Sequence, residues 1–179
     1  MNPLMLKEGI FAVNTRRFGT VAEVMVKRLV KLGRSKTQFH DLYDDLEKKR
    51  VEVKFSTVRK KNSRVITEDS VLDCIEDELS ANRQIKFSEW ADCEFDCNIQ
   101  QIKKDQFEVL YYGLFFSDTV IIFRIDSQNI GSKIFYSDKQ HKGNEGEGQF
   151  HINEKTLQIH IDNYQYSILT YDELYELLK

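Results

Sequence analysis

The chain has 179 residues, of which 41% are hydrophobic and 31% are charged, a composition typical of one globular domain rather than of a disordered protein. Since no apolar run approaches the ~20 residues of a membrane span and the first residues do not look like a signal peptide, we expect a cytoplasmic protein with no membrane partner. The formal net charge of −3 counts against a protein that only coats nucleic acid, but it is compatible with a nucleic-acid enzyme.

The first third of the chain predicts a helix followed by a β-hairpin. Apolar residues recur at helical spacing over 18–33, and Gly33 marks the expected end of this helix. Residues 37–44 and 50–58 are expected to form two strands, and the polar turn 44–48 joins them into a hairpin.

The middle of the chain predicts a helix and two buried strands. Thr67 is the expected N-cap of a helix over 67–79. Residues 98–104 are expected to form a short helix or turn. The apolar runs 107–116 and 119–125 are typical of central strands that are covered on both faces.

The last third of the chain begins with a polar, glycine-rich loop over 137–149. Two short strands near 148–152 and 157–161 follow, and a helix over 170–178, which starts with a capping box, closes the chain. This order of elements predicts an α/β (α+β) fold in which helices flank a mixed β-sheet.

The predicted hairpin brings charged side chains together. Side chains on a strand alternate between its two faces, so Glu52 and Lys54 lie side by side, away from the core. The preceding strand can place Asp41 opposite Glu52, and two converging carboxylates suit a divalent cation such as magnesium. Such a cation binds a phosphate oxygen and activates a water, while Lys54 stabilises charge at phosphorus or orients the water. The alternative is an amphipathic hairpin whose Glu and Lys only pair at the surface.

The segments 39–43 and 50–56, joined by a polar turn, resemble the PD-(D/E)xK nuclease motif in the form seen in type II restriction endonucleases. In that family an acidic residue near the end of one strand is followed by a hairpin turn and by acid-x-lysine on the next strand. A glutamate on the preceding helix is also common, and Glu23 matches it. The proline of the motif is absent, and His40 stands in its place.

The resemblance implies a restriction-endonuclease-like core and a set of site residues. The implied catalytic residues are Asp41, Glu52, Lys54 and, as an auxiliary, Glu23. The implied cofactor is Mg²⁺, held by Asp41, Glu52 and Val53.

Two of these assignments have alternatives within the sequence. Asp44 and Asp45 are nearer to the acid-x-lysine pair along the chain, but we prefer Asp41 as the first acid because its expected position is mid-strand. Glu23 could instead form an ordinary surface ion pair with Lys27, four residues later on the helix.

Three segments are candidates for contact with DNA. The basic run that follows the strand of Glu52 and Lys54 is suited to bind phosphates. The amides and lysines near residue 100 are suited to contact bases and phosphates. The glycine-rich loop allows the backbone to approach a groove of the DNA closely. The alternative for each is an ordinary solvated segment. The candidate DNA-binding residues are Arg59, Lys60, Lys61, Gln100, Gln101, Lys103, Lys139, Gln140, His141, Lys142 and Asn144.

We therefore expect a single nuclease domain over 1–179, with the catalytic core in 15–126 and DNA-recognition and closing elements in 127–179. The predicted function is Mg²⁺-dependent hydrolysis of double-stranded DNA at a specific short site. The resemblance further implies a homodimer and a functional pairing with a DNA methyltransferase. The alternatives are a junction resolvase or repair nuclease with the same core, and a non-catalytic DNA-binding module.

Overall fold

A six-stranded mixed sheet forms the centre of the chain in a computed structural model that describes residues 1–139 and 146–179. Its strands are β1 (Gly33–Arg34), β2 (Leu42–Asp44), β3 (Lys49–Thr57), β5 (Val109–Phe115), β6 (Thr119–Asp126) and β8 (Gln165–Thr170). They are ordered β1-β2-β3-β5-β6-β8, with β3 parallel to β5 and the other neighbours antiparallel. The predicted α+β fold with a mixed sheet is confirmed.

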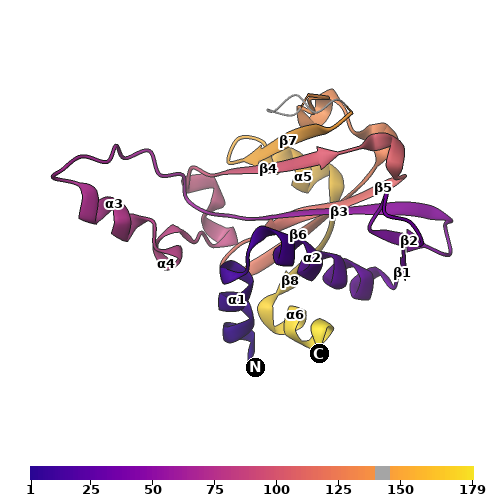
Figure 1. Cartoon of the computed structure of the whole chain (residues 1–179), viewed down its shortest axis with the longest axis horizontal. Helices are drawn as coiled ribbons and strands as arrows, with labels where there is room; N and C mark the ends of the chain where they lie inside the picture. The colour runs from indigo at the N-terminus through magenta and orange to yellow at the C-terminus, as the bar shows by residue number, and fades with distance from the viewer. Residues whose placement is uncertain (140–145) are drawn as a thin grey trace.

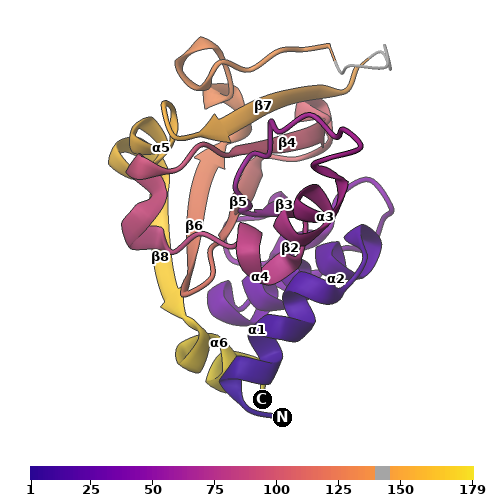
Figure 2. The same ribbon diagram turned by 90° about the vertical axis from the view of Figure 1, so that its left-hand side faces the viewer.

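Helices cover one face of this sheet and a small second sheet covers the other (Figures 1 and 2). The first face packs against α1 (Pro3–Ala12), α2 (Thr15–Val30) and α6 (Tyr171–Leu178). The second face packs against α5 (Leu157–Tyr164) and the antiparallel pair β4 (Asp96–Ile102) and β7 (Gly148–Asn153). Two buried apolar clusters result, one on each face of the large sheet.

Strands β5 and β6 form the buried middle of the sheet, which confirms the two predicted central strands. Every residue of β5 is buried, with Val109 and Tyr111 in the helix-side cluster and Leu110 and Tyr112 in the opposite one. The Tyr112 hydroxyl lies 2.8 Å from Nδ1 of the buried His160. Because burial lowers the pKa of His160 to about 4, this core histidine is neutral at neutral pH.

The predicted hairpin is formed by β2 and β3, but its first strand is much shorter than 37–44. The Ser35 hydroxyl donates to the Thr37 carbonyl at 2.7 Å, and the Thr37 amide donates back to Ser35 Oγ at 3.0 Å. The Thr37 hydroxyl also lies 3.2 Å from His40 Nδ1. These local bonds hold the chain in a turn, so the predicted strand over 37–41 is wrong.

The segment between β3 and β4 projects from one end of the sheet as an arm, which holds α3 (Val71–Asp77) and α4 (Ser80–Arg83) (Figure 1). The predicted helix over 67–79 is therefore present only in part. The prediction of Thr67 as its N-cap is wrong. Ser70 occupies that position, and its hydroxyl oxygen accepts a hydrogen bond from the Thr67 amide at 3.0 Å.

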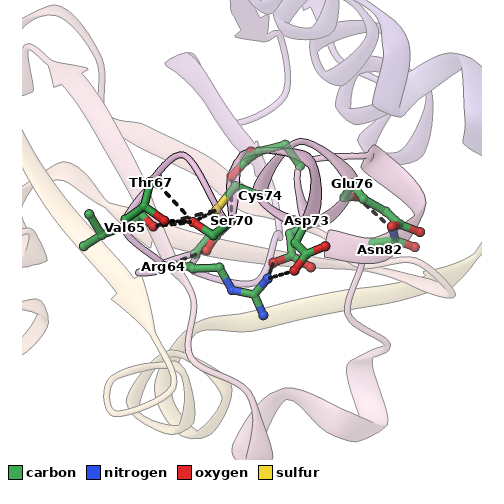
Figure 3. A network of polar contacts seen from close by, with 11 residues as sticks. Arg64, Val65, Thr67, Ser70, Asp73, Cys74, Glu76 and Asn82 are labelled. Carbon is green, nitrogen blue, oxygen red and sulfur yellow. Dashed lines mark hydrogen bonds and ion pairs between the residues drawn. The ribbon is translucent and has the colours of Figure 1, made fainter.

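Polar contacts fix the shape of the arm (Figure 3). Arg64 Nη1 lies 3.3 Å from Oδ2 of Asp77, and the Ser70 hydroxyl donates to the Val65 carbonyl at 3.1 Å. The arm also presents large apolar side chains to solvent. These are Val65, Ile66, Leu72, Ile75 and Leu79.

Two other predicted elements have the wrong type. Residues 98–104 belong mainly to strand β4, in which alternate side chains are buried, rather than to a helix or turn. Residues 157–161 open helix α5, and the predicted strand there is absent from the described structure. The side chains of Leu157 and His160, one helical turn apart, are the ones that enter the core.

The remaining predicted elements are confirmed. Strand β7 lies at the predicted 148–152. Helix α2 begins earlier than expected and ends at Val30, with Lys31 as a left-handed C-cap at φ 61°. The predicted end at Gly33 is therefore wrong, because Gly33 lies in strand β1. The Thr170 hydroxyl oxygen accepts from the Glu173 amide, which completes the predicted capping box of α6. Short 3₁₀ helices lie at Phe87–Asp92, Lys104–Gln106, Ser127–Asn129 and Ser132–Ile134. Among the described residues, no helix is both long and apolar enough to cross a bilayer.

Candidate active site

Strand β3 carries the acid-x-lysine pair on the side opposite the helix-side cluster. Val51 and Val53 are buried in the helix-side cluster, so the intervening Glu52 and the following Lys54 point the other way, as the alternation of a strand requires. Lys54 Nζ donates to Oε1 of Glu52 at 2.5 Å. The two side chains are 24% and 13% exposed, so this ion pair is only partly open to solvent.

Asp41 lies one residue before β2 and faces β3. Leu42 pairs with Val51, which places Asp41 next to Glu52 across the hairpin. One carboxylate oxygen of Asp41 accepts a hydrogen bond from the Val53 amide at 2.9 Å, and the Asp41 amide donates to the Val51 carbonyl at 3.1 Å. The prediction of a mid-strand position for Asp41 is wrong, because the turn described above ends just before it.

The other two candidates for the first acid lie at the far end of the hairpin. Asp44 pairs with Lys49, about three residues or 10 Å along β3 from Glu52. Its Oδ1 accepts hydrogen bonds from the amides of Leu46 and Glu47, so it closes the turn. Asp45 is the next residue in that turn. The geometry therefore brings Asp41, rather than Asp44 or Asp45, to Glu52.

Glu23 reaches the same place from helix α2. Its pKa is raised, first by partial burial and then by the negative charge of Asp41, while the positive charge of Lys54 opposes the shift. Within the described structure Glu23 and Lys27 form no ion pair, although they are four residues apart on one helix. The alternative, an ion pair between Glu23 and Lys27 on the surface of α2, is therefore not present in the described structure.

The pKa of Glu52 responds to Asp41, Glu23 and Lys54. Burial raises its pKa most, Lys54 lowers it through charge and a hydrogen bond, and the negative charges of Asp41 and Glu23 raise it further. Three carboxylates and one ammonium from α2, the turn before β2 and strand β3 therefore act on one another. A net negative cluster of this kind attracts a cation.

Beside this cluster lies a cleft of about 670 Å³, which we call the first cleft. Glu23, Asp41 and Lys54 contribute to its lining, and Gln100 and Gln101 of strand β4 also line it. At Gln101 the pairing of β4 with β7 shifts register and φ is 60°, a left-handed conformation that is costly outside glycine. Gln100 and Gln101, which lie at the bulge of β4, thus share a cleft with the carboxylates of Glu23 and Asp41.

Arg16 and Asn98 also line this cleft, but neither was among the site residues predicted from the sequence. Arg16 lies in the first turn of α2, and Asn98 lies on β4. A signal for Asn98 was present, because buried Cys97 and Ile99 flank it in a period of two. Arg16 has no such signal, since its approach depends on how α2 packs against the sheet.

The remaining predicted DNA-binding residues are scattered. Arg59 lines the first cleft, and its Nη2 donates to the Phe11 carbonyl at 3.1 Å. Lys60 and Lys61 are exposed outside the cleft lining, with backbone amides bonded to the Arg83 and Glu94 carbonyls.

Two more lysines in that set also lie outside the lining of the first cleft. Lys103 forms an ion pair with Glu147 at 3.0 Å, and Lys139 is exposed. The other predicted residues of the glycine-rich loop lie outside the described residues. They are Gln140, His141, Lys142 and Asn144.

The cluster fits magnesium in part. Among the described residues, no group of three or more His, Cys, Asp or Glu side chains is arranged to hold a metal ion. Magnesium is commonly held by only one or two carboxylates together with water, and Asp41 and Glu52 meet that lower requirement. Val53 offers backbone atoms alone, and its amide already binds Asp41. The residues present are thus compatible with Mg²⁺ at this pair of carboxylates.

Comparison with models of known protein families, with curated proteins and with solved structures found no match for this chain. The resemblance to PD-(D/E)xK nucleases accordingly stays a prediction that rests on the residues themselves.

Proposed function

We propose that this chain is a magnesium-dependent endonuclease of double-stranded DNA, of the restriction-enzyme type. The observation that carries the proposal is the convergence of Glu23, Asp41, Glu52 and Lys54, of which all but Glu52 line one cleft. These residues come from three parts of the chain, α2, the turn before β2 and strand β3, and Glu23 and Glu52 have raised pKa values. Partly buried like charges cost stability, and such clusters are enriched at functional sites.

Each protein group in the proposed site has a separate role. Asp41 and Glu52 would hold the cation, and the Val53 amide orients the Asp41 carboxylate. When bound, Mg²⁺ would supply Lewis-acid chemistry to the phosphate and to a water molecule. Lys54 neutralises Glu52 in the resting protein, and in the reaction its ammonium stabilises negative charge on the phosphate. Glu23 adds negative charge beside Asp41.

The composition of the first cleft supports DNA as the substrate. Arg16 and Arg59 carry the positive charge that phosphates attract. The side-chain amides of Asn98, Gln100 and Gln101 are of the type that reads base edges, adenine above all. Amides of this kind favour a sequence-reading enzyme over a junction resolvase, which recognises mainly shape and phosphates. The homodimer and the companion methyltransferase belong to this proposal through the resemblance alone.

One observation favours a non-catalytic DNA-binding module as a second candidate. Lys54 donates to Glu52, and this contact occupies an oxygen that a metal ion would use. If the pair serves only to neutralise charge on the hairpin, the cleft binds DNA without cutting it.

The test is to incubate the full chain with plasmid DNA, phage DNA and a four-way DNA junction, in Mg²⁺ and in EDTA. The proposal predicts discrete fragments of the linear duplex in Mg²⁺ and an intact duplex in EDTA. Cleavage of the branched DNA alone would assign the protein to the resolvases instead. Binding of duplex with no cleavage in Mg²⁺ would favour the non-catalytic module.

A further inference from the structure

A second cleft, of about 580 Å³, lies against the same carboxylates. Glu23 and Asp41 line both clefts, so the two clefts meet at the proposed catalytic cluster. We propose that this second cleft binds the phosphates of the DNA strand on one side of the cleaved bond. The inference rests on the proposed function and names a binding surface that the function alone does not supply.

The walls of the second cleft are positively charged. Helix α2 contributes Lys27 and Arg28, one helical turn beyond Glu23, and strand β1 contributes Arg34. Besides Glu23 and Asp41, no acidic side chain of the described residues lines this cleft. Three cations against two carboxylates leave the lining with a net positive charge, and the cations lie away from the carboxylates along the chain, so this part of the cleft attracts the phosphates of a polyanion.

Two of the three cations are available for a ligand. Among the described residues, Lys27 and Arg34 take part in no side-chain hydrogen bond or ion pair. Arg28 is different, because its Nη1 donates to the Leu177 carbonyl at 3.0 Å and joins α2 to α6. The inference therefore assigns phosphate binding to Lys27 and Arg34, and a mainly structural role to Arg28.

Neutral donors complete a phosphate-binding surface. Thr37 and Gln38, which follow β1, line the same cleft. Hydroxyl and amide groups supply many of the phosphate contacts in protein–DNA complexes, where they fix position without reading sequence. The two clefts differ in their side-chain amides, because Asn98, Gln100 and Gln101 of β4 line the first cleft and not the second.

The joining of the two clefts has a consequence for the reaction. An enzyme that cuts inside a strand must hold the strand on both sides of the reacting phosphate. A single cleft that ended at the carboxylates would suit removal of terminal nucleotides. With Arg16 and Arg59 in the first cleft and Lys27 and Arg34 in the second, cations flank the carboxylates on two sides. A DNA strand that runs from one cleft to the other past the carboxylates would be held on both sides of the reacting phosphate, as internal cleavage requires.

The test compares two double variants with equal loss of charge, Lys27→Ala with Arg34→Ala and, as control, Lys7→Ala with Arg17→Ala. Neither control residue lines either cleft. Affinity for a duplex is measured in EDTA over a range of salt concentrations. The inference predicts that the first variant binds roughly tenfold more weakly and that its slope of log affinity against log salt is reduced by about 2. The control should keep the wild-type slope.

The outcomes separate this inference from the proposed function. If the wild-type chain binds and cuts duplex DNA and both double variants keep its salt slope, the second cleft is not the strand path and the inference alone is overturned. If the wild-type chain neither binds nor cuts DNA, the proposed function fails and the inference fails with it. Thermal melting checks that the variants fold. If the first variant does not fold, Arg34→Ala alone replaces it, with an expected slope change of about 1.

Discussion

At the scale of single residues, Glu23 connects α2 electrostatically to the hairpin. Its pKa is raised, first by burial and then by Asp41, so the folded state favours the protonated carboxyl. A raised pKa in the folded state gives stability that is fully present below the unfolded value, near 4.5, and is lost as pH rises through the folded value. At neutral pH the ionised Glu23 therefore destabilises the fold.

Replacing Glu23 by Gln should stabilise the protein at neutral pH. The substitution removes the partly buried charge and its repulsion with Asp41. For a partly exposed group we expect a gain of about 0.5 kcal/mol, or a rise in Tm of roughly 1–2 °C at pH 7.5. The gain should vanish at pH 4, where the native carboxyl is protonated as well.

Melting curves of wild type, Glu23→Gln and the exposed control Glu8→Gln at the two pH values test this. A Glu23→Gln variant that is less stable than wild type at pH 7.5 would show that the carboxylate is stabilised in its site.

At the scale of elements, β5 requires a glycine at its centre. A Cβ at Gly113 would overlap the Ile121 carbonyl of β6 and the Phe55 ring of β3. The carbonyl belongs to the backbone of a buried neighbouring strand, so it cannot move aside without disturbing the sheet pairing.

Gly113→Ala should therefore destabilise the fold by about 3 kcal/mol, as measured by urea denaturation. The matched control is Gly9→Ala in α1, where nothing beyond the neighbouring residues and the backbone of its own helix lies within 4 Å of the added Cβ, and where alanine should be neutral or stabilising by up to about 1 kcal/mol. Equal stability of Gly113→Ala and wild type would contradict the packing described for β5 and β6.

Each element that was predicted correctly has a sequence pattern that fits only one type of secondary structure. The runs that became β5 and β6 are continuously apolar, and the alternation around Glu52 and Lys54 identifies β3 and the outward direction of both side chains. The start of α6 carries a reciprocal cap. In each case local sequence and tertiary packing favour the same structure.

The elements that were predicted with the wrong type have sequence patterns that fit both a helix and a strand, or a pattern that is interrupted. Leu157, Ile159 and Ile161 alternate like a strand, but Leu157 with His160 and Ile161 also forms a helical stripe, and packing selects the helix. On β4 the period of two breaks at the bulge around Gln101, which hides the strand. Helix α1 and the edge strand β8 were not predicted at all. The contribution of strand β4 to the lining of the first cleft was likewise not predictable, because it depends on contacts between distant segments.

At the scale of the whole molecule, the two clefts and the arm have different electrostatic characters. Cations flank the carboxylates in the clefts, and Arg59, at the start of the arm, is one of them, whereas the helical part of the arm over 68–77 carries Glu68, Asp69, Asp73, Glu76 and Asp77 near exposed apolar side chains. Phosphates are repelled by such an acidic surface. The proposed DNA path therefore follows the clefts beside α2 and the hairpin and leaves the acidic part of the arm, 68–77, free of DNA.

The measurement that tests the proposed function most directly is the effect of Lys54→Ala on cleavage and on binding of the same duplex, with Lys155→Ala, at an exposed site outside both clefts, as control. The proposed catalytic role predicts that cleavage in Mg²⁺ falls by roughly 10²–10³-fold or more while duplex affinity changes little, and that the control retains both. Cleavage at the wild-type rate by Lys54→Ala would contradict that role and remove Lys54 from the active site.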